Sequence, residues 1–292
     1  MRYPALQPRT VLVTGCSTGI GAAAARLLRD AGWQVFPTAR KPEDLAALES
    51  DGFTPIHLDM TDSESVQNAA ATALDLCNGE LGALVNNAGY GQSGAIEDIP
   101  RDAMRAQFET NVFGMQELTN CLIPVFRRRG QGRIVNVSSV VGRIAIPFNG
   151  VYSATKFAME ALSDILRVEL DGAGIAVSLI EPGPVVTNFR KTAVEQVESA
   201  VNLDASPFAA IYKRELPRKK ENPYRDLAWS RPPSAVAEKI RHALESSRPK
   251  RRYCITMPAY AGAILRRIAP DALVDHFMTR ALRKKLAAAS PD

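Results

Sequence analysis

The sequence has few cysteines and histidines, and their spacing excludes several kinds of site. Its four cysteines lie far apart, without a CxxC pair or the spacing of zinc ligands: Cys16, Cys77, Cys121 and Cys254. Neither a disulfide framework nor a metal site is indicated, and we expect reduced structural thiols. The three histidines show no nucleophile-elbow or metal-ligand spacing, so a histidine-dependent hydrolase would lack its base: His57, His242 and His276.

Long apolar runs are also absent. The first residues, "MRYPALQPRTVLVTG", contain no signal-peptide core, and no later stretch approaches the roughly 20 apolar residues that cross a bilayer. We therefore expect a soluble, cytoplasmic protein.

Positive charge is in excess but is not concentrated. The net charge of +5 and the pI near 9.1 come from short basic clusters at 127–129, 218–220, 248–252 and 283–285. Nucleic-acid binding would favour one basic face with a recognisable reading motif, and the sequence contains none, so no nucleic-acid partner is expected. An attraction to anionic substrates or to membranes remains open.

The first half of the chain alternates short apolar runs with helical patterns. Runs such as "TVLVTG", "QVFPTAR" and "GALVNNAG" are separated by segments such as "IGAAAARLLRDAG" and "ESVQNAAATALDLC". This alternation predicts βαβ units and a parallel sheet, hence an α/β protein. A further helix is expected from about residue 104 to residue 126. With 292 residues and 46% hydrophobic composition, the chain can form a sizeable core.

Two later segments depart from this alternation. Residues 184–232 are polar and contain prolines, and we interpret them as an insertion without clear elements that covers the substrate. Residues 258–292 are expected to form a C-terminal helical extension. Its apolar stripe is interpreted as a docking face, with membrane contact as the less favoured alternative: Leu273, Val274, Phe277, Met278, Ala281, Leu282 and Leu286.

A glycine-rich loop stands between the first predicted strand and the first predicted helix. In "VLVTGCSTGIGAAAARLL", Gly15, Gly19 and Gly21 follow the spacing G-x3-G-x-G. A pyrophosphate at a helix N-terminus needs close backbone N–H groups, and a Cβ in the turn would obstruct its approach. The strand before and the helix after the loop favour this interpretation over a simple glycine turn.

A basic residue ends the second predicted strand, in "FPTARKPEDL". NAD enzymes usually place an acidic residue there on the ribose 2′-hydroxyl, whereas arginine accommodates a 2′-phosphate. Arg40, followed by Lys41, therefore favours NADP(H) over NAD(H). The alternative is that Arg40 faces solvent beside Glu43 and Asp44.

Together, "TGCSTGIG", "LDMTD", "NNAG", "NVFG", "NVSS", "YSATK" and "EPGPVVT" resemble the classical branch of the short-chain dehydrogenase/reductase family over about residues 8–190. The resemblance implies a Rossmann-type, doubly wound parallel sheet of about seven strands, with helices on both faces in three α/β/α layers, formed by residues 1–292 as one domain. It also implies a homodimer or homotetramer that pairs the helices carrying Asn111 and Tyr152. The later segments look like members that act on hydroxysteroids and retinoids.

The resemblance also implies the site residues. The catalytic positions are Asn111, Ser139, Tyr152 and Lys156. Asp59 would bind the adenine side, Asn86 would line the cofactor cleft, and Lys156 would also hold the nicotinamide ribose. The full set of implied cofactor-binding residues is Gly15, Ser17, Thr18, Gly19, Ile20, Gly21, Arg40, Asp59, Met60, Asn87, Ala88, Gly89, Tyr152, Lys156, Pro182, Gly183, Val185 and Thr187.

The catalytic residue types suit carbonyl reduction. Tyr152 and Lys156 are four residues apart and would share a helix face, where a lysine cation could lower the pKa of a phenol that donates a proton. Ser139 could hold the substrate oxygen, and Asn111 would bind a water that relays protons to Lys156. The alternatives are a partly buried tyrosine beside a surface lysine, and a helix-interior asparagine bonded to its own backbone.

The favoured hypothesis is an NADP(H)-dependent oxidoreductase that interconverts an alcohol and a ketone or aldehyde on a small, fairly apolar steroid-, retinoid- or acyl-like substrate. The alternative is a regulatory protein that senses NADP(H) and turns over little.

Overall fold

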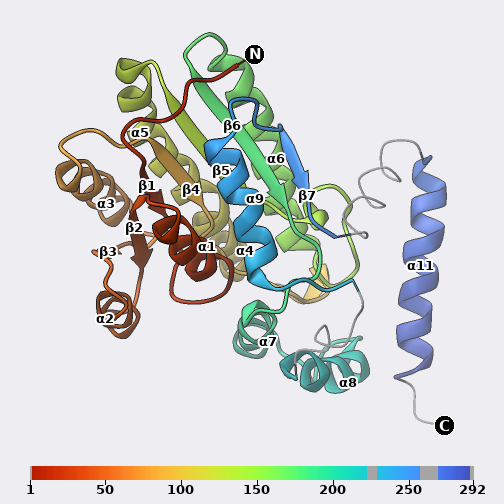
Figure 1. Ribbon diagram of the computed structural model, residues 1–292. Helices are drawn as coiled ribbons and strands as arrows, with labels where there is room; N and C mark the ends of the chain where they lie inside the picture. The colour runs from red at the N-terminus through yellow and green to blue at the C-terminus, as the bar shows by residue number, and fades with distance from the viewer. Residues whose placement is uncertain (1, 222–228, 257–268, 290–292) are drawn as a thin grey trace.

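The computed structural model describes residues 2–221, 229–256 and 269–289. Its centre is a seven-stranded sheet in the order β3-β2-β1-β4-β5-β6-β7, in which every strand pair is parallel (Figure 1). The strands are β1 (Thr10–Val13), β2 (Gln34–Ala39), β3 (Ile56–His57), β4 (Ala83–Asn86), β5 (Gly132–Val137), β6 (Ile175–Glu181) and β7 (Arg252–Cys254). The predicted doubly wound parallel sheet is confirmed.

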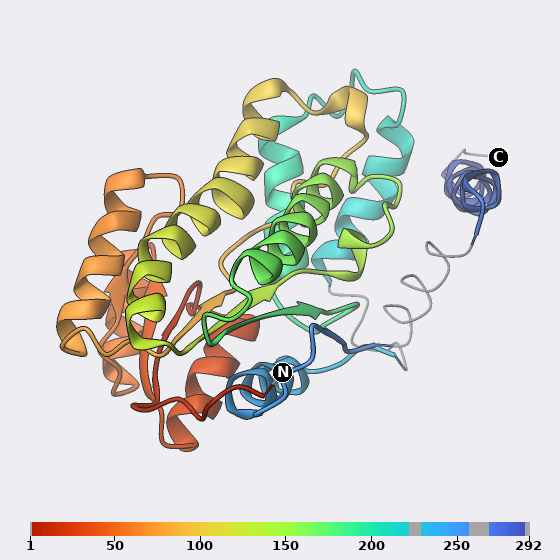
Figure 2. The same ribbon diagram turned by 90° about the horizontal axis from the view of Figure 1, so that it is seen from above.

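Helices cover both faces of the sheet, as Figure 2 shows. Along β1, Val11 and Val13 belong to one apolar cluster and Leu12 belongs to the other, because successive side chains of a strand point to opposite faces. The first cluster includes α1 (Gly19–Asp30), α2 (Pro42–Ser50) and α9 (Pro233–Glu245). The second includes α3 (Ser63–Leu76), α5 (Gly114–Arg129) and α6 (Gly150–Glu169). The predicted three layers are therefore confirmed.

The chain reverses its direction of winding between β1 and β4. From β1 it continues outward to β2 and β3, and it then returns to pair β4 with the other side of β1. In open parallel sheets, the crevice at the carboxyl ends of strands on either side of such a point is where ligands bind. The loops after β1, β4 and β5 therefore form the candidate site.

The helix expected at about residues 104–126 is interrupted. It consists of α4 (Arg101–Phe108), a π-helical turn η2 (Glu109–Phe113) and α5. The turn places Asn111 and Val112 in the interior. Such a turn is frequent at functional sites because it breaks the regular helical hydrogen-bond ladder. Two short 3-10 turns, η1 (Ile96–Asp98) and η3 (Val140–Gly142), follow β4 and β5 respectively.

Residues 184–232 contain regular structure, so the expectation of an insertion without clear elements is wrong. They form α7 (Phe189–Ala200) and α8 (Ala209–Lys220), which lie together below the sheet in Figure 1, while 222–228 fall outside the described residues. Short stripes such as Val194 with Val197, and Ile211 with Leu216, pack in a separate apolar cluster with Phe148. Stripes this short give a weak helical pattern in the sequence.

The C-terminal helix α11 (Asp271–Ala287) has a divided apolar stripe. Val274 is buried and Leu282 packs against the α7–α8 cluster, whereas Leu273 and Phe277 are exposed. The first part of the predicted extension, 258–268, lies outside the described residues. Across the described ranges, no helix is both long and apolar enough to cross a membrane.

Candidate active site

The loop between β1 and α1 is packed tightly against the residues that follow β4. Gly15 has a φ of +70°, and a Cβ there would lie 2.8 Å from the Cα of Ala88. Asn87 Nδ2 donates to the carbonyls of Thr14 and Gly15, at 2.9 and 3.0 Å. A Cβ on Gly21 would overlap the Gly15 carbonyl. The loop therefore has room for backbone only, which is what close approach to a pyrophosphate requires.

The start of α1 suits an anion. Thr18 precedes the helix and makes no side-chain capping hydrogen bond, and the first turn contains no acidic residue. The first N–H groups of a helix have no intrahelical partner, and the helix dipole favours negative charge there. Gly19, at a φ of +62°, faces Thr187, whose Cγ2 would lie 3.3 Å from an added Cβ. The residues present therefore fit the phosphates of a dinucleotide.

Arg40 lies directly after β2 and faces Asp59. Its side chain is 62% exposed, and its Nη1 is 3.9 Å from Asp59 Oδ2. Burial by itself would raise the pKa of Asp59, but hydrogen bonds from Thr61 and the charge of Arg40 outweigh it, so this pKa lies below its usual value. Arg40 thus presents an exposed guanidinium at the end of β2, while Asp59 stays ionised beside it.

Tyr152 lies in the first turn of α6 and is buried. Its ring contacts Phe189, at 5.4 Å between ring centroids. Burial raises the pKa of Tyr152 well above its ordinary value, and a hydrogen bond with Ser139 acts in the opposite direction. The hydroxyls of Tyr152 and Ser139 are therefore neighbours.

Lys156, one turn further along α6, is only 5% exposed. Its Nζ donates to the Val137 carbonyl at 2.8 Å and lies 5.8 Å from the centroid of the Tyr152 ring. Burial lowers the pKa of Lys156 to about 8, and the charge of Glu160 opposes this. Lys156 is thus held near Tyr152 by its bond to β5, and the expectation that it lowers the pKa of the phenol stays a prediction.

Asn111 links η2 to the loop after β4. Its Oδ1 accepts from the Tyr90 N–H at 3.2 Å, and its Nδ2 donates to the Tyr90 carbonyl at 2.9 Å and to Thr155 Oγ1 at 3.2 Å. The side chain bonds another loop and another helix, so the alternative of bonding to its own backbone is wrong. Asn111 fixes the position of Tyr90 relative to α6, the helix that carries Tyr152 and Lys156.

Ser139 begins the turn after β5 and is held by long hydrogen bonds. Its Oγ donates to the Pro182 carbonyl at 3.4 Å and accepts from the Val141 N–H at 3.3 Å. Bonds of this length are weak, so the hydroxyl can reorient toward a substrate oxygen.

The remaining predicted cofactor residues surround the same crevice. Ser17 and Thr18 are exposed in the glycine loop, while Ile20 packs against the core. Buried Met60 contacts Gly114, Gly89 contacts Asn111, and Gly183 contacts Thr256. Val185 is paired with Arg231. Within the described ranges, no group of three or more histidine, cysteine or acidic side chains could hold a metal ion.

A model of the short chain dehydrogenase family matches residues 9–198. The chain belongs to the short-chain dehydrogenase family. It is therefore an oxidoreductase of the kind that interconverts alcohols and carbonyls with a nicotinamide cofactor, and its seven parallel strands are those of the family's Rossmann-like fold.

This short-chain dehydrogenase is similar to several curated proteins. The uncharacterized oxidoreductase YbbO of Escherichia coli is 40% identical over 270 residues, which cover 92% of this chain and 94% of YbbO. Retinol dehydrogenase 8 of Bos taurus is 39% identical over 84% of this chain and 80% of its own. The 17-beta-hydroxysteroid dehydrogenase type 6 of Bos taurus is 36% identical over 96% and 90%. The predicted likeness to retinoid and hydroxysteroid enzymes is confirmed.

Solved structures of dehydrogenases also match this chain over most of its length. A short-chain dehydrogenase from Streptomyces avermitilis is 31% identical with a TM-score of 0.77, covering 97% of this chain and 100% of its own. A serine dehydrogenase complexed with NADP+ has a TM-score of 0.72, 25% identity and coverages of 85% and 94%. A Burkholderia phymatum enzyme in complex with NAD has a TM-score of 0.73, 26% identity and coverages of 91% and 94%. Neighbours of this dehydrogenase thus include complexes with either cofactor.

Two features of the dehydrogenase site were not predicted from the sequence. The first is Phe189, which packs on Tyr152 from α7, and no sequence spacing connects these two residues. The second is an ionic network behind Lys156: Arg252 contacts Glu160 at 3.1 Å and Glu181 at 3.0 Å, and Arg143 lies 3.8 Å from both carboxylates. Burial, then the charge of Glu181, raises the pKa of Glu160 above its ordinary value. In the sequence, the four-residue spacing of Lys156 and Glu160 on a helix is the signal that could have indicated a carboxylate near Lys156.

Proposed function

We propose that this dehydrogenase uses NADP(H) to interconvert an alcohol and a ketone or aldehyde, with Tyr152 as the proton donor and acceptor. The observation that carries the proposal is the meeting of Ser139, Tyr152 and Lys156 at the carboxyl edge of the sheet, beside the glycine loop. When bound, the nicotinamide supplies or accepts the hydride.

The cofactor preference rests on Arg40. A 2′-phosphate carries negative charge next to the adenosine ribose, and a guanidinium recognises phosphate by charge and by geometry. Arg40 is exposed at the end of β2, and its contact with Asp59, at 3.9 Å, is too long to be a hydrogen bond. NADP(H) is therefore favoured over NAD(H). Residues 15–21, with Asn87 and Ala88, would hold the pyrophosphate.

Each of four residues of the chain has a separate role in the proposed reaction. Ser139 donates to the substrate oxygen and stabilises the negative charge that develops there, and Tyr152 gives that oxygen its proton. Lys156 Nζ lies 5.8 Å from the centroid of the Tyr152 ring, and its positive charge would stabilise the phenolate that forms when Tyr152 gives up its proton. Asn111 fixes the positions of η2, the loop after β4 and α6 relative to one another through its hydrogen bonds to Tyr90 and Thr155.

The substrate is proposed to be fairly apolar, a steroid-, retinoid- or acyl-like compound. Phe189 covers the ring of Tyr152 and is 37% exposed, so it offers an apolar surface at the reaction centre. The names of the bovine relatives, a retinol dehydrogenase and a hydroxysteroid dehydrogenase, support the same class. We further propose that α7 and α8 form part of the cover over the substrate, since α7 begins at Phe189, which contacts the ring of Tyr152.

A homodimer or homotetramer is proposed from the exposed surface of α6. Phe157, Leu162, Ile165 and Val168 are 40%, 38%, 58% and 65% exposed, and Phe113 of η2 is 54% exposed. An exposed apolar surface on these elements is typical of a protein interface. A twofold pairing through α5 and α6 would bury it.

The test is a panel of ketones, steroids, retinal and aliphatic aldehydes, mixed with purified protein and either NADPH or NADH. We expect loss of nicotinamide absorbance with at least one apolar carbonyl compound, and a kcat/KM at least about tenfold higher with NADPH. Tight NADPH binding without reduction of any compound would instead favour the regulatory alternative.

A further inference from the structure

Lys156 lies in the interior without a directly bonded carboxylate. Its side chain is buried in α6, and it forms no ion pair with a described residue. Its hydrogen-bond partners are the Val137 carbonyl at 2.8 Å and the Met159 sulfur at 3.9 Å, and neither carries a full charge. Burial of an unpaired ammonium favours its neutral form. The proposed function, however, needs the charged form of Lys156 beside Tyr152.

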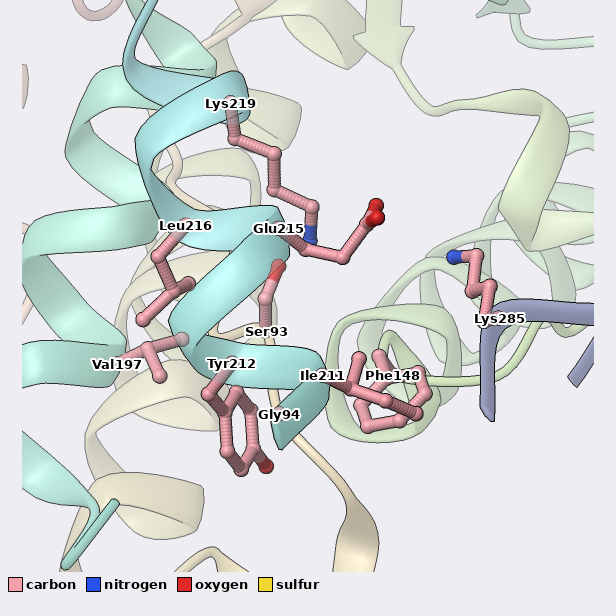
Figure 3. Close-up of a pocket in the computed structure, with 10 residues that line it drawn as sticks. All are labelled: Ser93, Gly94, Phe148, Val197, Ile211, Tyr212, Glu215, Leu216, Lys219 and Lys285. Atoms are coloured by element: carbon pink, nitrogen blue, oxygen red, sulfur yellow. The ribbon is translucent and has the colours of Figure 1, made fainter. Parts of the chain in front are cut away.

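Glu160 is the carboxylate one turn further along α6. It follows Lys156 by four residues, a spacing that places two side chains on one face of a helix, and both residues are only 5% exposed. The same spacing on α8 brings the side chains of Glu215 and Lys219 into one space, as Figure 3 shows. The charge of Glu160 holds the pKa of Lys156 above the value that burial alone would give.

The side chains of Lys156 and Glu160 reach the same part of the sheet. Lys156 ends at the carbonyl of Val137, the last residue of β5. Glu160 ends beside Glu181, the last residue of the neighbouring strand β6, because Arg252 contacts the two carboxylates at 3.1 and 3.0 Å. Neighbouring strands lie about 4.8 Å apart, so the ammonium and the carboxylate are close without direct contact.

The Glu160 carboxylate is fixed through one of its oxygens. Nε and Nη2 of Arg252 both donate to Oε2 at 3.1 Å, and Arg143 Nη1 lies 3.8 Å from the same oxygen. Oε1 is buried and accepts no hydrogen bond of ordinary geometry from a described residue. The Cys254 thiol beside this cluster stays neutral, because burial raises its pKa to about 12. The Oε1 side of the carboxylate therefore has no bonded cation.

Glu160 is not required as a partner for Arg252, which already contacts Asp164 at 2.6 Å and Glu181 at 3.0 Å. Burial and the charge of Glu181 raise the pKa of Glu160, and Arg252 opposes this rise by favouring the carboxylate form. Burying a second carboxylate beside Glu181 is thus unfavourable in itself. The buried cation that benefits from it is Lys156.

We propose that Glu160 keeps Lys156 protonated during turnover. Glu160 is thus a positioning residue, since it acts through the charge of Lys156. This role deepens the proposed function and rests on it, because the protonated lysine is the form that stabilises the Tyr152 phenolate. Without the charge of Glu160, Lys156 would release its proton at a lower pH, and the rate of carbonyl reduction would fall there.

The experiment follows the titration of Lys156 by NMR in cofactor-free protein that contains carbon-13-labelled lysine. The Lys156 signal is assigned by its loss in Lys156→Met. We expect its titration midpoint to fall by about 0.5–1 pH unit in Glu160→Gln, since a nearby carboxylate favours the ammonium form. Lys219 is the internal reference, because burial lowers its pKa to about 8 as well and it lies on α8; its midpoint should not change.

Asp164→Asn is the matched control. Asp164 also lies on α6 and contacts Arg252, at 2.6 Å, but it is one turn further from Lys156 than Glu160 is. This variant should leave the Lys156 midpoint within about 0.2 pH unit of the wild-type value, and Glu160→Asp, which keeps the charge, should recover most of the shift. An unchanged midpoint in Glu160→Gln, or an equal fall in Asp164→Asn, would overturn the inference.

Turnover gives a second measurement. With NADPH and the best carbonyl substrate of the panel, the alkaline fall of kcat should move to lower pH by the same amount in Glu160→Gln. This corresponds to a kcat about threefold to tenfold lower at pH 9, with a change of less than about twofold at pH 6.5. A lower Lys156 midpoint with an unchanged pH profile of kcat would also overturn the role in turnover. If no carbonyl compound were reduced, the proposed function would be wrong, and the NMR titration alone would decide whether Glu160 keeps Lys156 protonated.

If Glu160→Gln did not fold, Lys156→Met would decide. The coupling between two charges is reciprocal, so loss of the lysine cation should raise the titration midpoint of the Glu160 carboxyl by the same amount, about 0.5–1 pH unit. The measurement is NMR of protein that contains carbon-13-labelled glutamate, with the Glu181 carboxyl followed in the same spectra. No rise at Glu160 would overturn the inference.

Discussion

Replacing Lys156 with methionine should change how the stability of the protein depends on pH. Lys156 is buried in α6, and burial lowers its pKa from 10.5 to about 8 despite the opposing charge of Glu160. Methionine has a similar length and no charge. The substitution also removes the hydrogen bond to the Val137 carbonyl, to which the neutral amine formed above pH 8 can still donate.

The sign and size of the effect follow from the two pKa values. At about pH 7 the lysine is charged in both the folded and the unfolded states. As the pH rises past 8, the folded protein releases this proton while the unfolded chain keeps it until about 10.5, so the free energy of unfolding rises with pH. Between about pH 7 and pH 9.5, wild type should gain about 2 kcal/mol relative to Lys156→Met.

The assay is urea unfolding of both proteins at the two pH values, followed by circular dichroism, without cofactor. The control is Lys191→Met, whose side chain is exposed and whose difference from wild type should not change with pH. If the difference between wild type and Lys156→Met were the same at both pH values, the charge of Lys156 would cost nothing on burial, and our account of its environment would be refuted.

Three further predictions concern cofactor, assembly and substrate. Arg40→Asp should weaken NADPH binding by about tenfold to hundredfold and NADH binding by less than about threefold, measured by fluorescence titration; equal effects would remove Arg40 from 2′-phosphate recognition. The double variant Ile165→Glu, Val168→Glu should reduce the mass measured by light scattering to that of a monomer, because it places charge on the exposed face of α6; an unchanged mass would mean that this face is not the interface. Phe189→Ala should raise the KM for an apolar aldehyde by about tenfold with kcat changed less than about threefold, since it removes an apolar contact at Tyr152; a fall in kcat alone would indicate a role in chemistry instead.

The sheet and its two helical layers could be predicted because their signals are local. In β1, successive side chains point to opposite faces of the sheet. Val11 and Leu12 are both apolar, so the sequence indicates a strand that is buried on both faces. The glycine loop was also predictable, since glycine in the sequence marks places without room for a side chain. In the structure, a Cβ on Gly15 or on Gly21 would meet backbone atoms.

The features that could not be predicted from the sequence depend on contacts between distant segments. Residues 189–220 gave no clear helical pattern, because only a few positions of α7 and α8 pack, and they pack on Phe148 and on each other instead of on the sheet. The position of Phe189 on Tyr152 cannot be derived from spacing either. Spacing on a helix shows that Lys156 lies near Tyr152, and it does not show that both side chains are buried or that Lys156 bonds to Val137.

The central claim, that Tyr152 exchanges the proton with the substrate, is tested most directly by Tyr152→Phe. With NADPH and the best carbonyl substrate of the panel, kcat should fall by at least about a hundredfold, while the Kd for NADPH should stay within about threefold of the wild-type value. Tyr253→Phe, which removes a hydroxyl that bonds Lys250 and His242, is the matched control and should keep the wild-type kcat. Equal turnover by Tyr152→Phe and wild type would contradict the account.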